Sequence, residues 1–201
     1  YSNKTMTTGE GGMIISEDSE LHKIYKQKRS HGMNKNVLDR FTSSSNKWEY
    51  DVDEIGYKYN LTDVASAIGL AQLKKLFEGQ RLRAKIYSLY ISEINKEQLW
   101  TTSSADDKGM HSHHLFQIRA FDIDNFRERL IKDFESKNIG YSVHYKPLHQ
   151  LKIWKKFSSK NEDFVNSNKH FAGCISLPIY PEMPLEDLNS ILDVINRNLS
   201  N

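Results

Sequence analysis

The stretch from Lys4 to Ile15 reads KTMTTGEGGMII, and the expectations for the fold begin with it. A lysine precedes a glycine-rich turn, and the turn leads into three apolar residues, Met13–Ile15, that favour a short β-strand. Glycine suits tight turns because it adopts positive φ angles without a steric penalty. Glu10, which stands between the glycines, is therefore expected to serve the turn and its hydrogen bonds rather than act as a catalytic acid.

The composition is that of an ordinary globular protein. The chain has 201 residues, of which 38% are hydrophobic and 27% charged, and Lys+Arg 28 against Asp+Glu 26 leaves a net charge of +2. A surface with such balanced charges has no strong positive potential to attract a phosphate backbone, which argues against nucleic acid as a partner. One cysteine, Cys174, excludes an intrachain disulfide, and it is expected to be a buried small hydrophobic residue. No apolar run is long enough to cross a membrane, and no secretory leader is recognisable, so we expect a cytoplasmic protein.

Hydrophobic periodicity predicts two parts joined by a long helix. Ser16–Asp18 begins a helix that Gly32 ends, and residues 33–55 are expected to form a loop. The longest helical pattern opens at Thr62-Asp63 and runs to about Ile94. Strands are then predicted at 115–121, 139–145 and 175–177, with one helix capped by Asp122 or Asp124 and a last helix beginning near Pro184. The pattern is α/β, with residues 1–80 and 81–201 as two domains, the second of them a small α+β domain.

Four further segments carry residues suited to ligand binding. In chain order they read GYKYNLTD (56–63), HHLFQI (113–118), IGYSVHYKPLH (139–149) and LPIYPEM (177–183). Together with residues 4–15 they span nearly the whole chain in a fixed order. A set of this kind is far more specific than any one of its members.

These five segments resemble the DegT/StrS family of pyridoxal-phosphate (PLP) enzymes, which are mostly nucleotide-sugar aminotransferases of fold type I. The form Gly-Tyr-Lys-Tyr-Asn is similar to a subgroup that includes the UDP-4-amino-4-deoxy-L-arabinose aminotransferase. The resemblance implies that this chain is the C-terminal half of such a transferase: a remnant of the large PLP-binding domain, joined by a long helix to the small domain. The other half of the family's chain carries the phosphate-binding loop and the Asp that pairs with the pyridinium nitrogen.

The resemblance also implies the functional residues. Lys4 corresponds to the lysine that binds the cofactor's aldehyde and moves protons as general base and acid, so it is both catalytic and cofactor-binding. Asn60 corresponds to a residue that reaches the PLP phosphate of the partner subunit in a homodimer. His144, Tyr145 and His149 are expected to face the substrate. Thr62 is expected to cap the long helix rather than bind a ligand.

The predicted function is transfer of an amino group from an amino acid, expected to be glutamate, to a keto-sugar nucleotide in polysaccharide or glycan sugar biosynthesis. The alternative is a non-catalytic fragment that acts as an oligomerisation or sugar-nucleotide-binding module. A sugar dehydratase is disfavoured because such relatives carry His where Lys4 stands. His111, His113 and His114 suggest a metal only weakly, because no cysteine or acidic residue lies at zinc-ligand spacing, and no metal is expected.

Overall fold

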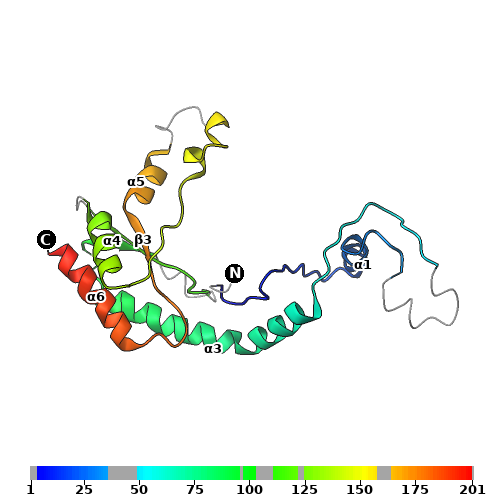
Figure 1. Cartoon of the computed structure of the whole chain (residues 1–201), viewed down its shortest axis with the longest axis horizontal. Coiled ribbons are helices and arrows are strands. Elements are labelled where there is room, and N and C mark those ends of the chain that lie inside the picture. Colours follow the sequence, from blue (N-terminus) through cyan, green and yellow to red (C-terminus); the bar gives the residue numbers. More distant parts are fainter. Residues whose placement is uncertain are drawn as a thin grey trace. The chain divides into compact units, whose positions relative to one another are not determined.

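The computed structural model describes residues 4–35, 49–95, 97–102, 111–121, 125–157 and 164–200 (Figure 1). The chain divides into two compact units, one formed by Met6–Lys74 and the other by the chain from Lys75 onward together with Lys4 and Thr5. The division falls within a helix. The assignment of residues 1–80 and 81–201 to two domains stays a prediction.

The structure contains helices, short 3₁₀ turns and one small sheet. In chain order these are α1 (Ser19–Lys28), α3 (Asp63–Glu93), β1 (Leu99–Thr101), β2 (Phe116–Ala120), α4 (Phe126–Ser136), η1 (Leu148–Gln150), η2 (Lys155–Phe157), α5 (Val165–Gly173), β3 (Cys174–Leu177) and α6 (Leu185–Leu199). The helices predicted after residues 16–18 and 62–63, and the strands predicted at 115–121 and 175–177, are confirmed.

In the first unit, side chains and a glycine define the ends of α1. The Asp18 carboxylate accepts hydrogen bonds from the backbone N–H groups of Glu20 and Leu21, at 2.8 and 3.2 Å. These are two of the donors that a helix start leaves without a partner. After the helix, Gly32 has φ +74, and a Cβ at this position would lie 1.8 Å from the carbonyl oxygen of Glu54. Both the positive φ and this close approach require glycine.

The second unit is built around an antiparallel sheet with strand order β1-β2-β3. In the β2–β3 register Phe116 lies opposite Leu177, and Gln117 lies opposite Ser176. Ser176 of β3 also forms an isolated antiparallel bridge with Ser142, which places residues 142–144 along the edge of the sheet.

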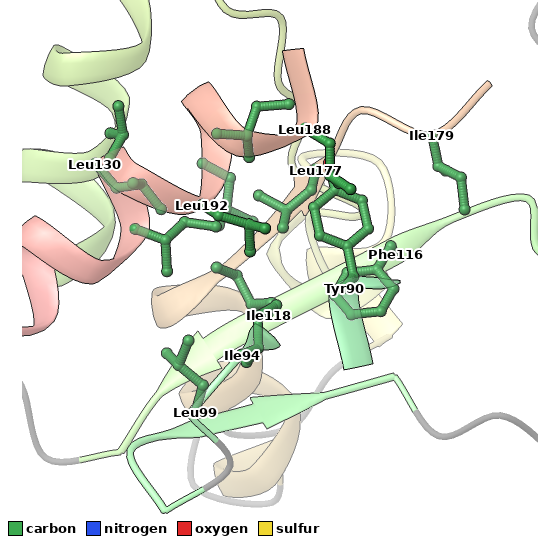
Figure 2. Packing of buried hydrophobic residues seen from close by; sticks show 14 of the residues in the cluster. Tyr90, Ile94, Leu99, Phe116, Ile118, Leu130, Leu177, Ile179, Leu188 and Leu192 are labelled. Atoms are coloured by element: carbon green, nitrogen blue, oxygen red, sulfur yellow. The ribbon is translucent and has the colours of Figure 1, made fainter. Parts of the chain in front are cut away.

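The core of this unit forms where the sheet meets α3, α4 and α6. Figure 2 shows Leu130 and Leu192 reaching from α4 and α6 toward the strands, and the rings of Tyr90 and Phe116 lying together. The two rings are stacked with centroids 4.7 Å apart. The Tyr90 hydroxyl donates to the carbonyl oxygen of Pro178 at 2.9 Å, and burial raises the pKa of Tyr90 above its ordinary value. Cys174 is buried as predicted, and burial raises the pKa of its thiol.

Two predicted strands are wrong. Met13–Ile15 forms no ladder, and its side chains are 70–84% exposed, because no described strand lies beside it and a strand exists only when paired. In the segment 139–145 only Ser142 pairs, with Ser176, so one bridge replaces the strand. Asp122 and Asp124 lie outside the described residues, and Asn125 occupies the N-cap position of α4 without a side-chain hydrogen bond.

The strand β1 and the α-helix α5 were missed from sequence, as were the 3₁₀ turns η1 and η2. β1 has three residues, too few for an alternating pattern to be recognised. α5 opens without a side-chain cap and buries none of its residues fully, so neither a start signal nor an apolar stripe marks it.

We expect Phe116→Ala to lower the free energy of unfolding by about 3–5 kcal/mol, because it removes a fully buried ring from the stack with Tyr90 and leaves a cavity. Urea denaturation of the chain, followed by circular dichroism, measures this. The matched control is Phe157→Ala, whose ring is 71% exposed and should change stability by no more than about 0.5 kcal/mol. Equal losses in the two variants would contradict the packing described.

Candidate active site

Lys4 lies in the second unit, where its side chain contacts a residue just before the start of β2. Its side chain is exposed, and Nζ lies 3.4 Å from Nε2 of His114, two residues before the strand begins. A protonated lysine amine can donate hydrogen bonds but cannot accept them. In this contact Nε2 of His114 is therefore the acceptor. Within the described chain no carboxylate pairs with Lys4. Its amine is therefore held beside a ring rather than locked in an ion pair.

His114 was named in the sequence as part of a strand motif and as a weak metal candidate, and the structure places it beside Lys4. Because Nε2 accepts from Lys4, the proton of the neutral ring belongs on Nδ1. Nδ1 is buried, and it has no hydrogen-bond partner within the described residues. Burial lowers the pKa of His114, and the positive charge of Lys4 lowers it further. The ring is thus kept neutral, with one buried N–H that still lacks an acceptor.

His144 lies near the same lysine. Its Nδ1 is 2.7 Å from the hydroxyl oxygen of Ser176, and its carbonyl oxygen accepts from the Gln117 side-chain amide at 2.8 Å. Burial lowers the pKa of His144, and the charge of Lys4 adds to this. The structure therefore brings two neutral imidazoles, His114 and His144, within electrostatic reach of one amine.

A cavity of about 470 Å³ adjoins both histidines. Its walls come from residues 137–144 on one side and residues 176–191 on the other. Ile139, Leu177 and Met183 give it apolar surface, while the Tyr180 hydroxyl donates to the carboxylate of Asp187 at 3.1 Å. A cavity of this size and mixed lining suits a small organic ligand with several oxygen atoms.

The other predicted substrate residues take different positions. Tyr145 is exposed, and its ring meets the His144 ring edge-on with centroids 4.5 Å apart. His149 is buried, with Nε2 2.7 Å from Oδ1 of Asn168, and its ring stacks on Phe164 at 4.3 Å. His149 lines a second hollow of about 410 Å³ and not the one beside His114. The substrate roles of all three residues stay predictions.

Asn60 belongs to the first unit and lies exposed three residues before α3. Thr62 caps this helix as predicted, because its hydroxyl oxygen accepts from the backbone N–H of Ala65 at 3.2 Å. Helix starts attract anions, since their first N–H groups have no partner in the helix. The role of Asn60 at a phosphate stays a prediction.

The glycine-rich turn uses its glycines as expected. Gly9 has φ +85, and a Cβ on Gly11 would lie 2.5 Å from the hydroxyl oxygen of Thr8. That hydroxyl donates to the carbonyl oxygen of Glu10 at 3.0 Å. Glu10 thus takes part in the turn through its backbone, in agreement with the prediction.

The histidine cluster offers a pair of rings rather than a metal cage. Nδ1 of His111 lies 3.1 Å from Nδ1 of His113, before β2 begins. Across the described residues, no three His, Cys, Asp or Glu side chains are grouped as a metal site would require. Nor is any helix of that part of the chain long and apolar enough for a bilayer span.

Comparison with known proteins places these features in a family. The model of the DegT/DnrJ/EryC1/StrS aminotransferase family matches residues 1–196, and the chain belongs to this family. It is 34% identical over 97% of its length to the spore coat polysaccharide biosynthesis protein SpsC of Bacillus subtilis. It is also 34% identical, over 96% of its length, to the UDP-4-amino-4,6-dideoxy-N-acetyl-beta-L-altrosamine transaminase of Campylobacter jejuni.

Solved structures confirm the fold. PseC of Helicobacter pylori, an aminotransferase in pseudoaminic acid biosynthesis, matches 98% of this chain with 26% identity and a TM-score of 0.81. The sugar aminotransferase Spr1654 of Streptococcus pneumoniae, in its PMP-form, matches 94% with a TM-score of 0.80. The chain spans about half the length of the curated relatives it matches, 51% and 49% for the two named above. It therefore has the fold of part of a fold type I sugar aminotransferase, as predicted.

Pyridoxal phosphate is the cofactor of this family, and Spr1654 was solved in a PLP-form as well as a PMP-form. The residues of this chain fit one end of that cofactor. Lys4 offers an exposed amine that no described carboxylate engages, so that an aldehyde can reach it. The buried Nδ1–H of His114 is a donor without an acceptor, beside a cavity that takes a small molecule.

We expect Lys4→Met to raise the pKa values of both His114 and His144, because a nearby positive charge disfavours a charged imidazole. Both values should still stay below the ordinary value of about 6.5, since burial remains. Titration of the ring resonances of the full chain by nuclear magnetic resonance (NMR) measures the effect.

Two controls accompany this titration. Lys4→Arg keeps the charge and should leave both pKa values lowered. His170, whose pKa is lowered by burial and by Arg119, should not respond to Lys4→Met. If His114 and His144 titrate identically with and without Lys4, the cluster is not formed in solution.

Proposed function

We propose that this chain supplies the C-terminal part of a PLP-dependent aminotransferase that moves an amino group from an amino acid, glutamate, to a keto-sugar nucleotide. The pathway is the biosynthesis of sugars for cell-surface polysaccharides or other glycans. The observation that carries the proposal is the exposed Lys4 amine beside two neutral histidines and a cavity of small-molecule size. Relatives named for spore coat polysaccharide biosynthesis and for an amino-sugar nucleotide transaminase support it.

The cofactor, when bound, supplies an electron sink for the carbanion at the donor's α-carbon. Among the residues of this chain, Lys4 has the central chemical role in this proposal. Its Nζ would hold the cofactor at the aldehyde carbon and, once released, would carry the proton from the donor's α-carbon to the cofactor's C4′ carbon. His114 orients this amine, because its Nε2 accepts a hydrogen bond from Nζ without adding a charge.

The remaining predicted residues bind the ligands in this proposal. His144, Tyr145 and His149 contact the sugar nucleotide, and the exposed Asn60 reaches the phosphate of the cofactor in the partner subunit of a homodimer. The protein acts in the cytoplasm. The subgroup of the arabinose aminotransferase is part of the same proposal, and its support is the form Gly-Tyr-Lys-Tyr-Asn at residues 56–60.

The central test locates the cofactor's bond. We expect borohydride treatment of the PLP-loaded active assembly, followed by peptide mapping, to place the pyridoxyl group on Lys4. Lys4→Arg should abolish both the label and amino transfer, while Lys74→Arg, an exposed lysine in α3, should leave both intact. A label on another lysine would overturn the role of Lys4. An assembly that binds sugar nucleotide but is never labelled would favour the non-catalytic alternative.

Asn60 gives a second test. We expect Asn60→Ala to weaken PLP retention by roughly 1–3 kcal/mol, the scale of one hydrogen bond to a charged phosphate. Equilibrium dialysis of the dimeric assembly against PLP measures the affinity. Asn196→Ala, a change on the exposed side of α6, serves as the control. Unchanged retention, or an active monomer, would count against a role across the dimer interface.

A further inference from the structure

Ser176 is a polar residue where the strand pattern calls for an apolar one. All four residues of β3 are buried, and the other three are Cys174, Ile175 and Leu177. The Ser176 side chain is 3% exposed. A buried hydroxyl costs free energy unless it makes a hydrogen bond, so its partner is expected to matter. That partner is Nδ1 of His144, at 2.7 Å.

The direction of this bond follows from the surroundings of the hydroxyl. If the Ser176 hydroxyl accepted a hydrogen bond from an Nδ1–H, its own O–H would need a second acceptor. Among the described residues, its hydroxyl bonds to His144 and to no other group. The hydroxyl therefore donates, Nδ1 accepts, and the proton of the neutral His144 ring belongs on Nε2.

The backbone holds both ends of this pair. The N–H of Ser176 donates to the carbonyl oxygen of Ser142 at 2.7 Å, and the N–H of Ser142 donates back at 3.2 Å. The amide of Gln117, opposite Ser176 in the sheet, donates to the carbonyl oxygen of His144 at 2.8 Å. With the main chain fixed on both sides, the hydroxyl decides how the imidazole is oriented.

The other ring nitrogen of His144 is available to a ligand. Nε2 has no hydrogen-bond partner in the described part of the chain, and it is not among the buried atoms that lack one, so it is open to solvent. His144 and Ser176 both line the 470 Å³ cavity that also includes His114. An Nε2–H donor at this wall of the cavity suits a ligand whose oxygen atoms accept hydrogen bonds.

We propose that Ser176 is a positioning residue: its buried hydroxyl holds His144 as the tautomer whose Nε2–H donates to an acceptor oxygen of the substrate. The structural part of this inference, the tautomer and its dependence on Ser176, stands by itself. Its consequence for turnover rests on the proposed function.

The first experiment observes the ring nitrogens of the full chain. In long-range ¹H–¹⁵N NMR spectra at a pH where the ring is neutral, we expect His144 to be a single Nε2–H tautomer with a hydrogen-bonded Nδ1. Ser176→Ala should shift the Nδ1 resonance and give a detectable share of the Nδ1–H form. Ser176→Thr, which keeps a hydroxyl, should restore the original spectrum.

Two controls separate this effect from general disturbance. Ser190→Ala removes a hydroxyl from the same cavity without touching His144 and should leave its spectrum unchanged. The ring of His149 is tied to Asn168 and should not respond to any of these variants. An Nδ1–H tautomer in the wild-type chain would overturn the proposal, as would a His144 spectrum that is identical in Ser176→Ala.

The second experiment is a double-mutant cycle in the PLP-loaded active assembly. We expect Ser176→Ala to raise KM for the keto-sugar nucleotide about tenfold, equivalent to about 1.4 kcal/mol, with a smaller change in kcat. In a His144→Asn background the same change should have almost no further effect, because the two residues act as a unit. Fully additive effects would assign Ser176 a structural role only. If no variant, wild type included, transfers amino groups, the proposed function fails while the NMR result still decides the tautomer.

Discussion

The antiparallel pairing of β2 with β3 is the constraint on which the second unit depends. Its register places Phe116 opposite Leu177, and both side chains join the core under α4 and α6. The same register places Gln117 opposite Ser176, so that two polar side chains hold His144 at once. A slip of one residue would turn every side chain of one strand to the other face, and it would lose the core and the His144 contacts together.

Electrostatics explains why the site can hold one amine and two imidazoles. If Lys4, His114 and His144 were all positively charged, they would repel one another at short range. Burial and the charge of Lys4 lower the pKa values of both rings, so the cluster carries the charge of the lysine alone. The neutral rings then offer N–H donors, and the site suits ligands rich in acceptor oxygens, as sugars and carboxylates are.

Much of the regular structure of the first unit could be predicted from sequence. The features that were predicted correctly depend on residues only a few positions apart. They are the cap at Asp18, the glycine-rich turn and the long apolar pattern after Thr62. Such local relations can be recognised from the sequence alone. The failures share a cause. Met13–Ile15 has strand-forming side chains without a partner strand, and residues 139–145 find only one pairing residue, because pairing depends on segments distant in the chain.

The functional residues divide in the same way. The order of five motifs along the chain was enough to predict the family and the fold, because that order is a property of the sequence itself. The role of Lys4 stays a prediction. Only the tertiary structure could select His114 as the neighbour of Lys4, because 110 residues separate them. It also shows that His144 pairs with Ser176, whereas the ring of His149 contacts Asn168 and Phe164. Strand register and packing decide which ring faces which group, and no local pattern of residues encodes either one.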